Sequence, residues 1–155
     1  MESSDHGAGS LAFQVRRTWL SMRAALDIEL KTFELSTSQY ATLMILKEAP
    51  GCSPSDVARA VATTRQAANE MLANLERDDL IERRPHPSDR RSQQLFLTTA
   101  GQRRLAKARI AVAQREAELE AGFTESQRTA VRAWLEGVSG ACNPQSGSSD
   151  QSPDV

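Results

Sequence analysis

Near the middle of the chain, a short run of polar residues includes three types whose side chains can each make two hydrogen bonds to one partner molecule. It reads Thr63-Thr64-Arg65-Gln66-Ala67-Ala68-Asn69-Glu70. Arg, Gln and Asn can each make two hydrogen bonds to one guanine or adenine base in the major groove of DNA, and a helix N-terminus offers free N–H groups to a phosphate. The run therefore predicts DNA contacts through Thr64, Arg65, Gln66 and Asn69. Alternatively, the polar side of this capped helix is simply exposed to solvent and contacts no other molecule.

Cations are concentrated in the segment that follows, residues 83–109. Eight of them are opposed there by Asp89 alone, so the segment carries a net charge of +7 while the whole chain carries −1. They are Arg83, Arg84, Arg90, Arg91, Arg103, Arg104, Lys107 and Arg109. Clustered positive charge neutralises phosphates, and an arginine on a projecting loop can enter a narrow minor groove. The alternative is that the arginines only keep an exposed hairpin soluble.

Hydrophobic periodicity and caps predict the elements that position these side chains. Apolar residues recur every three or four positions along residues 11–33, which indicates a long amphipathic helix. Caps predict further helix starts at Ser36, Ser53, Thr63-Thr64, Thr98 and Thr124. Residues 80–84 and 93–97 read as two strands of a hairpin. We therefore expect a mainly α fold with a small β-hairpin, in which two short consecutive helices form a helix-turn-helix.

The loop between the two strands is polar and stiffened by proline. Pro85 and Pro87 lower the entropy cost of holding the loop outward. Asp89 would be repelled by a phosphate, so we expect it to pair with Arg90 or Arg91 and to fix the shape of the loop.

Composition excludes several other classes of protein. The 155 residues fit one domain, and aromatic residues make up only 5% of them, which argues against a stacking platform for single-stranded nucleic acid. Two distant cysteines and two histidines indicate no metal site, and no cofactor or catalytic motif is present. The N-terminus does not read as a secretory signal, and no apolar run could span a membrane. We expect a cytoplasmic protein that is not an enzyme.

An ordered set of motifs resembles the MarR family of winged helix-turn-helix transcription regulators. The resemblance covers about residues 11–139, and its motifs are LSTSQY at 35–40, NLERDDLIER at 74–83, DRRS at 89–92 and LTTAG at 97–101. Two residues depart from the family pattern. Asp79 stands where Gly is common, at a helix end that often adopts a left-handed conformation, which Asp tolerates. Glu70 stands where a basic or small residue is common, which puts the details of base contact in doubt.

The resemblance implies a homodimer that straddles a palindromic operator in double-stranded DNA, most often as a repressor. It places Arg65, Gln66 and Asn69 in the major groove and Thr64 at a phosphate. Arg90 or Arg91 would lie at the minor groove, and Arg84 would belong to the same DNA-contacting surface. Asp89 would form an ion pair within the wing. The division expected is 10–35 and 98–139 as dimerisation helices, 36–97 as the DNA-binding lobe, and 1–9 and 140–155 as disordered tails. The apolar stripes of the terminal helices fit a dimer interface, although a long helix could also pack within one chain.

DNA binding by such a regulator can be controlled by a small-molecule ligand or by oxidation of a cysteine. Many relatives bind a small aromatic or anionic effector, and here the side chains of Trp19, Met22, Arg23, Tyr40 and Met44 could line such a pocket, or the apolar ones could simply be core. A redox-responsive regulator is an alternative, because Cys52 precedes a helix N-terminus that would lower its pKa. A helical adaptor protein without DNA binding is a third hypothesis.

Overall fold

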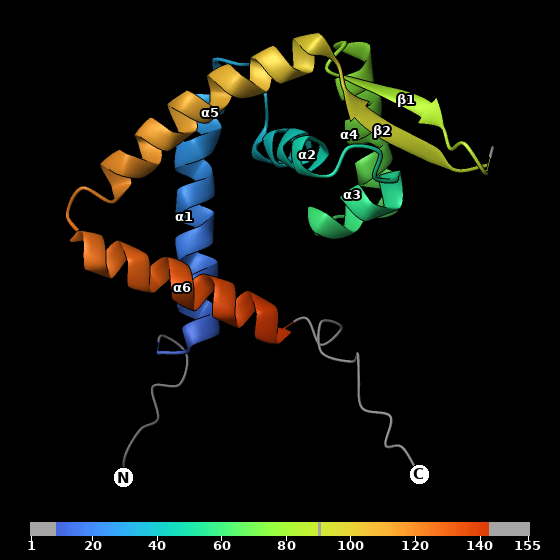
Figure 1. Cartoon of the computed structure of the whole chain (residues 1–155). Helices are drawn as coiled ribbons and strands as arrows, with labels where there is room; N and C mark the ends of the chain where they lie inside the picture. Colours follow the sequence, from blue (N-terminus) through green and yellow to red (C-terminus); the bar gives the residue numbers. More distant parts are fainter. Residues whose placement is uncertain (1–8, 90, 143–155) are drawn as a thin grey trace, which may run out of the picture. The chain divides into compact units, whose positions relative to one another are not determined.

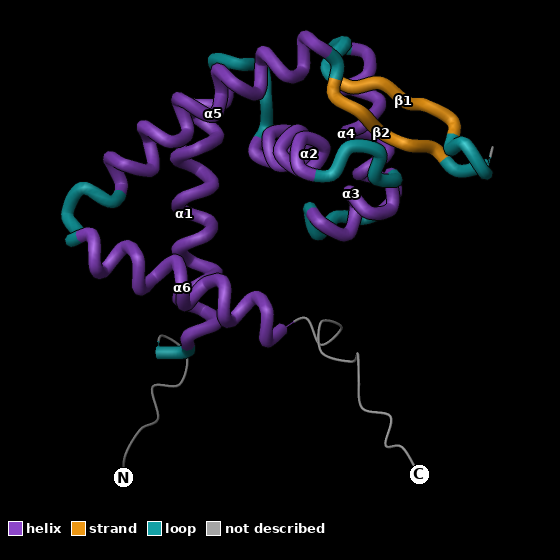
Figure 2. Tube along the Cα trace, viewed as in Figure 1, coloured by secondary structure: helices purple, strands orange, loops and turns teal. Residues whose placement is uncertain are grey.

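The computed structural model describes residues 9–89 and 91–142 (Figure 1). Its elements are α1 (Leu11–Lys31), α2 (Thr37–Glu48), α3 (Pro54–Ala60), α4 (Arg65–Arg77), β1 (Ile81–Pro85), β2 (Gln93–Leu97), α5 (Thr99–Leu119) and α6 (Glu125–Cys142). The predicted class, mainly α with one hairpin, is confirmed (Figure 2). The chain falls into two compact units that divide between Arg115 and Glu116. α1 and the first part of α5 therefore belong to the same unit as α2, α3, α4 and the hairpin.

The three short helices of the first unit begin where their caps predict. The Ser36 side chain accepts the N–H of Gln39, and the Gln39 side chain returns a bond to the N–H of Ser36. Ser53 and Asp56 form the same reciprocal box at the start of α3. At α4 the N-cap is Thr64, whose hydroxyl accepts the N–H of Ala67 at 3.1 Å. Because each cap satisfies otherwise unpaired amides, these starts are readable from sequence.

The two strands pair in antiparallel register, with Ile81 opposite Leu97. The connection between α2 and α3 extends this sheet, because the N–H of Gly51 donates to the carbonyl of Leu95 at 2.8 Å and the N–H of Leu95 to the carbonyl of Cys52 at 3.0 Å. Gly51 has φ +87°, a left-handed conformation that favours glycine. The hairpin is thereby fixed to the connection between α2 and α3 through the middle of β2.

Leu80, which the sequence predicts as the first strand residue, instead completes the end of α4. Its N–H donates to the carbonyl of Leu75 at 2.9 Å, and the preceding Asp79 has φ +57°. This is the left-handed helix end that the family pattern assigns to Gly, and it confirms that Asp79 adopts the same conformation. The Thr98 hydroxyl donates to the Asp79 carbonyl, which ties the start of α5 to the same turn.

Apolar side chains from every helix of the first unit, most of them leucines, form the core. The largest fully buried apolar side chains are Leu30, Leu43, Leu46, Val57, Leu72, Leu75, Leu80, Ile81, Leu95 and Leu105. Along α4, Ala68, Leu72 and Leu75 are buried as the sequence predicts, and Met71 is partly buried. The outer face of α4 is left free for other contacts.

Asp27 joins α1 to the start of α2. Its Oδ1 accepts the N–H of Thr37 at 3.0 Å and also the hydroxyl of Thr37, and its Oδ2 lies 3.7 Å from Nε of Arg23. The bond from the Thr37 hydroxyl is the main reason why the pKa of the Asp27 carboxyl lies below its ordinary value. The charged form of Asp27 is therefore favoured by folding.

We expect Asp27→Asn to lower the free energy of unfolding by about 1 kcal/mol at pH 7, the usual net worth of such a hydrogen bond. Because the folded pKa is depressed, this stability is present above the unfolded value of about 3.9 and is lost as the pH falls through the folded value. Urea unfolding of both proteins between pH 3 and pH 7 measures the difference. It should narrow below about pH 4, and a constant difference would contradict the assignment. Asp78→Asn is the control, because the Asp78 side chain has no hydrogen bond or ion pair within residues 9–89 and 91–142.

Two helices carry large apolar side chains that remain exposed in the single chain. On the first half of α1 they are Leu11, Phe13, Val15, Trp19, Leu20 and Met22; on α6 they are Val131, Trp134, Leu135 and Val138. None of the described residues of α6 is buried. Exposed apolar surface of this extent is characteristic of an interface.

The second unit contains the end of α5, a turn and α6. Arg132 holds the turn to α6 through two bonds from its Nη2 to the Glu120 carboxylate, at 2.7 and 2.8 Å. The predicted cap at Thr124 is present, with the N–H of Gln127 at 3.3 Å from the Thr124 hydroxyl. α6 continues to Cys142, three residues into the segment predicted as a tail; the rest of that tail and residues 1–8 lie outside the described residues.

Candidate nucleic-acid interface

The outer face of α4 presents the polar side chains that the sequence singles out. Arg65, Gln66 and Asn69 are exposed, whereas Ala68, Leu72 and Leu75 of the same helix are buried. The Thr64 hydroxyl is already engaged as the N-cap, which orients the first turn. Nε2 of Gln66 donates to Oε1 of Glu70 at 3.3 Å, so Glu70 shares this face and fixes the amide of Gln66.

The tip of the hairpin is closed by hydrogen bonds within the loop. The N–H of Arg91 donates to Oδ1 of Asp89 at 2.9 Å, and the N–H of His86 donates to the Ser92 carbonyl at 2.9 Å. Asp89 thus shapes the loop through the backbone of Arg91, whose side chain is exposed. Arg90 lies outside the described residues, so its predicted ion pair with Asp89 stays a prediction.

Along β1, two arginines pair with acids that lie outside the counted segment 83–109. Nε of Arg83 lies 3.1 Å from the Glu76 carboxylate, and its Nη1 donates to Gln93 at 3.0 Å. Arg84 pairs with Glu82 and lies 4.3 Å over the ring of Phe96. The +7 charge of residues 83–109 is therefore not a uniform cationic patch, because folding brings glutamates from outside the segment to it. Arg84 would have to leave both partners to contact DNA.

α4 and the hairpin belong to one lobe, in which α4 packs against β1. The hairpin extends past the helices of the lobe, with its tip away from the core (Figure 1). A helix whose outer face carries Arg, Gln and Asn fits the major groove, and an adjoining projecting loop can reach the backbone or minor groove. The described residues contain no group of three or more His, Cys, Asp or Glu that could hold a metal ion, and no described helix has the length and apolar content to cross a membrane.

The five side chains predicted for an effector pocket line neither of the two hollows described below, so that pocket stays a prediction. Trp19 is 51% exposed and Met22 37% exposed on the apolar face of α1, whereas Tyr40 and Met44 pack against the core of the lobe. Arg23 contacts Asp27 on its own helix. The expectation that all the apolar members are core is wrong for Trp19 and Met22.

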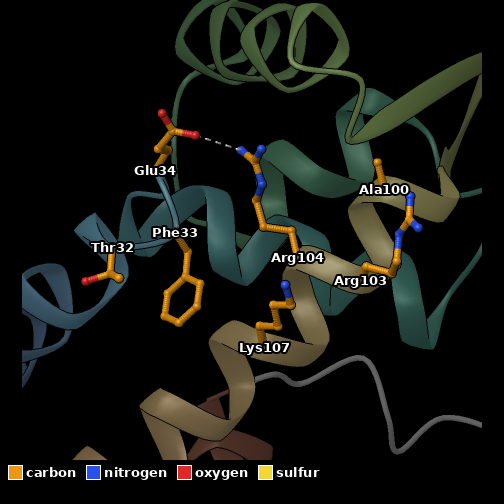
Figure 3. Close-up of a pocket in the computed structure, with 7 residues that line it drawn as sticks. All are labelled: Thr32, Phe33, Glu34, Ala100, Arg103, Arg104 and Lys107. Atoms are coloured by element: carbon orange, nitrogen blue, oxygen red, sulfur yellow. Dashed lines mark ion pairs between the residues drawn. The ribbon is translucent and has the colours of Figure 1, made fainter.

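Two hollows occur elsewhere on the first unit, and sequence reasoning found neither. One, of about 450 Å³, is lined by Thr32, Phe33, Glu34, Ala100, Arg103, Arg104 and Lys107 (Figure 3). The other, of about 480 Å³, is lined by Leu46, Lys47, Pro50, Arg84, Phe96, Leu97 and Gln102. The positive charge of residues 103–107 is visible in the sequence, but its place beside the end of α1 requires the fold.

The environment of Cys52 overturns the predicted shift of its pKa. Burial raises the pKa of the thiol, and the negative charge of Asp56 raises it further. The prediction that the N-terminus of α3 lowers the pKa of Cys52 is therefore wrong. A raised pKa leaves less thiolate, the form that reacts with oxidants, so the structure does not favour redox control through Cys52.

Comparisons of the sequence and of the structure with known proteins both find transcriptional regulators. Residues 35–93 match the model of the MarR family. The transcriptional repressor Rv2887 of Mycobacterium tuberculosis is 27% identical over 126 residues, which cover 81% of this chain and 91% of the repressor. A structure of the repressor CouR bound to a 23-mer DNA duplex superposes with a TM-score of 0.79, at 27% identity over 90% of this chain and 99% of that one.

A structure of Rv2887 in complex with salicylic acid superposes with a TM-score of 0.73, at 26% identity over 85% of this chain and 98% of that one. The matched family and these relatives are transcriptional regulators, not enzymes. The family match spans the helix-turn-helix and most of the hairpin, and the structural matches extend the likeness to the remaining helices. Over residues 35–93 the chain is therefore similar to the MarR family of transcription regulators, and over most of its length its fold is similar to that of solved regulators.

Proposed function

We propose that the protein is a homodimeric repressor that binds a palindromic operator in double-stranded DNA and is released by a small-molecule effector. The observation that carries the proposal is the outer face of α4, where Arg65, Gln66 and Asn69 are exposed together next to the projecting hairpin. The DNA-bound structure of the similar repressor CouR supports the transfer of DNA binding to this chain.

In this proposal the two parts of the lobe have separate roles. Arg65, Gln66 and Asn69 read base edges in the major groove, and the free N–H groups at the start of α4, oriented by Thr64, approach a phosphate. Arg91, with Arg90, reaches the minor groove from the hairpin tip. Because the Glu70 carboxylate would be repelled by phosphate, we expect it to lie away from the DNA backbone.

The dimer is supported by the exposed apolar faces of α1 and α6, which a second copy could cover. Two-fold symmetry would place two recognition helices on successive major grooves, with half-sites about 34–36 Å apart. The effector is an aromatic acid in this proposal, supported by the salicylic acid complex of the similar repressor Rv2887.

A binding experiment tests the DNA-reading role of α4 directly. An operator is first selected from random duplexes with the wild-type protein, and its affinity is then measured by gel shift at several salt concentrations. We expect Arg65→Ala to weaken operator binding by roughly 5- to 100-fold, the worth of a paired contact to a base, and to relax the preferred sequence. Arg91→Ala should weaken binding to all sequences and reduce the salt slope by about 1.

Arg109→Ala is the matched control, because this exposed arginine lies on α5 away from α4 and the hairpin tip. It should leave operator affinity and sequence preference unchanged. Failure of the selection to enrich any sequence would refute the DNA-binding proposal. Enrichment of a sequence whose recognition does not depend on Arg65 would refute the assignment to α4.

A further inference from the structure

Glu70 lies on the side of α4 that points farthest from the core. The buried side chains of this helix are Ala68, Leu72 and Leu75. Because successive residues of an α-helix are rotated by about 100°, Glu70 is turned about 165° from the mean direction of these three and Gln66 about 150°. Both side chains are exposed. When α4 enters a major groove, we therefore expect the Gln66–Glu70 pair to approach the base edges.

The Glu70 carboxylate forms no ion pair within the described part of the chain. Its neighbours one turn away on α4 are Gln66, Ala67, Ala73 and Asn74, none of which is charged. Nε2 of Gln66 donates to its Oε1 at 3.3 Å, and a hydrogen bond at this spacing stabilises a helix only slightly. A carboxylate with no cation beside it therefore stands on a surface that is proposed to meet DNA.

The hydrogen bond to Gln66 holds one oxygen of the carboxylate and leaves the other available. Oε2 of Glu70 accepts no hydrogen bond from the residues that the structure describes. An ionised carboxylate accepts hydrogen bonds and has none to donate. Among the groups that bases present in the major groove, only the amino groups of cytosine and adenine donate. Glu70 therefore fits a base amino group and is repelled by the carbonyl oxygens of guanine and thymine.

The two amino groups differ in what lies beside them. Adenine presents the N7 acceptor next to its N6 amino group, and the N7 lone pair repels a carboxylate that approaches. Cytosine presents its N4 amino group with no acceptor beside it on the same base. A side chain that only accepts is therefore better matched to cytosine than to adenine.

We propose that Glu70 is a specificity-determining residue that accepts a hydrogen bond from N4 of a cytosine in each operator half-site and rejects thymine at that position. The proposal rests on the DNA-binding part of the proposed function and adds one base to the expected operator. Because phosphates repel Glu70 on any DNA, the cytosine contact offsets a cost that all other sequences retain. Glu70 thus widens the ratio of specific to non-specific affinity.

Selection from random duplexes with wild type, Glu70→Gln and Glu48→Gln measures the base preference at every operator position. Wild type should prefer cytosine over thymine at one position of each half-site by about tenfold or more. Glu70→Gln should lose this preference and keep the others, because a glutamine amide can accept from cytosine or donate to thymine. It should also bind non-preferred sequences roughly threefold more tightly, since a repulsive charge is removed.

Glu48→Gln is the matched control, because it removes the same charge from an exposed glutamate at the end of α2. It should keep the wild-type preference for cytosine. A gel shift with N4-methylcytosine at the same position then isolates the hydrogen bond. In the base pair the methyl group replaces the amino hydrogen that faces the major groove, and pairing with guanine is kept. We expect wild type to lose about tenfold in affinity, and Glu70→Ala, whose side chain is too short to reach the methyl group, to bind both duplexes equally.

A cytosine preference that survives Glu70→Gln would overturn the proposal, and the carboxylate would then be only a solvated residue of the helix. Equal losses by wild type and Glu70→Ala on the methylated duplex would overturn it as well, as would an operator in which no cytosine depends on Glu70. If wild type enriches no sequence at all, the proposed function fails and this inference fails with it. Loss of the cytosine effect alone refutes only the inference, so the two failures are distinguishable.

Discussion

Replacing Gly101 with alanine is expected to lower the free energy of unfolding by roughly 3 kcal/mol, the upper range for a methyl group forced into a packed interior. A Cβ built on Gly101 would lie 2.0 Å from the carbonyl oxygen of Leu80 and 2.9 Å from its carbonyl carbon. Both are backbone atoms, so no side-chain rotation relieves the clash. The first turn of α5 would have to move away from the end of α4.

That movement would break the hydrogen bonds that hold the turn in place. The Leu80 carbonyl accepts the N–H of Thr98 at 3.1 Å, and the Thr98 hydroxyl accepts the N–H of Gly101 at 2.9 Å while it donates to the Asp79 carbonyl. Because β1 begins directly after Leu80, we also expect the operator affinity of Gly101→Ala to fall, even at temperatures where the variant remains folded.

Urea unfolding measures the effect on stability, with Gly137→Ala as the matched control. Gly137 is also helical, but a Cβ there would meet no atom within 4 Å. The control substitution should leave stability unchanged or raise it by up to about 1 kcal/mol, since alanine favours helix over glycine. If both alanine variants unfold at the same urea concentration, the close packing of α5 on Leu80 is wrong.

The elements that the sequence predicts are those determined by neighbouring residues. The caps at Ser36, Ser53 and Thr64 depend on side chains three positions from the amides they bind, so a short window of sequence contains all the information. The left-handed turn at Asp79 is equally local. The end of α4 at Leu80 shows the limit, because an apolar residue there fits both a strand and a helix-terminating contact.

Charge pairing and hollows depend on contacts between distant parts of the chain, which a count along the sequence does not contain. Glu76 lies outside the cationic segment yet neutralises Arg83, and Glu34 reaches Arg104 from the opposite wall of a hollow. The stripe along α1 shows a related limit. Periodicity identifies the apolar face from Leu11 onward, but burial within the chain begins only at Leu26, because periodicity does not say which partner covers a face.

The uncovered part of that stripe and the apolar face of α6 lead to the second large effect, on assembly. Leu135 is 46% exposed in the single chain and lies beside Trp134, with Val131 and Val138 one turn away on either side. If a second copy covers this face, Leu135→Asp places an unpaired carboxylate in an apolar interface. In a two-fold dimer each substitution counts twice, so we expect a loss of at least about 4 kcal/mol in association, roughly a thousandfold in the dissociation constant.

Sedimentation equilibrium of wild type and variants measures this loss, and Ala133→Asp is the control. Ala133 is exposed and lies two positions from Leu135, on nearly the opposite side of the helix, so the same charge is added without entering the apolar face. We expect wild type and Ala133→Asp to be dimers and Leu135→Asp to be a folded monomer with greatly reduced operator affinity. A wild-type monomer at micromolar concentration, or a Leu135→Asp dimer as tight as wild type, would show that something other than a second copy covers this face of α6. In the proposed function, a palindromic operator is bound by the two lobes of a dimer at once. Operator affinity should therefore fall in Leu135→Asp, which loses the dimer, and stay unchanged in Ala133→Asp.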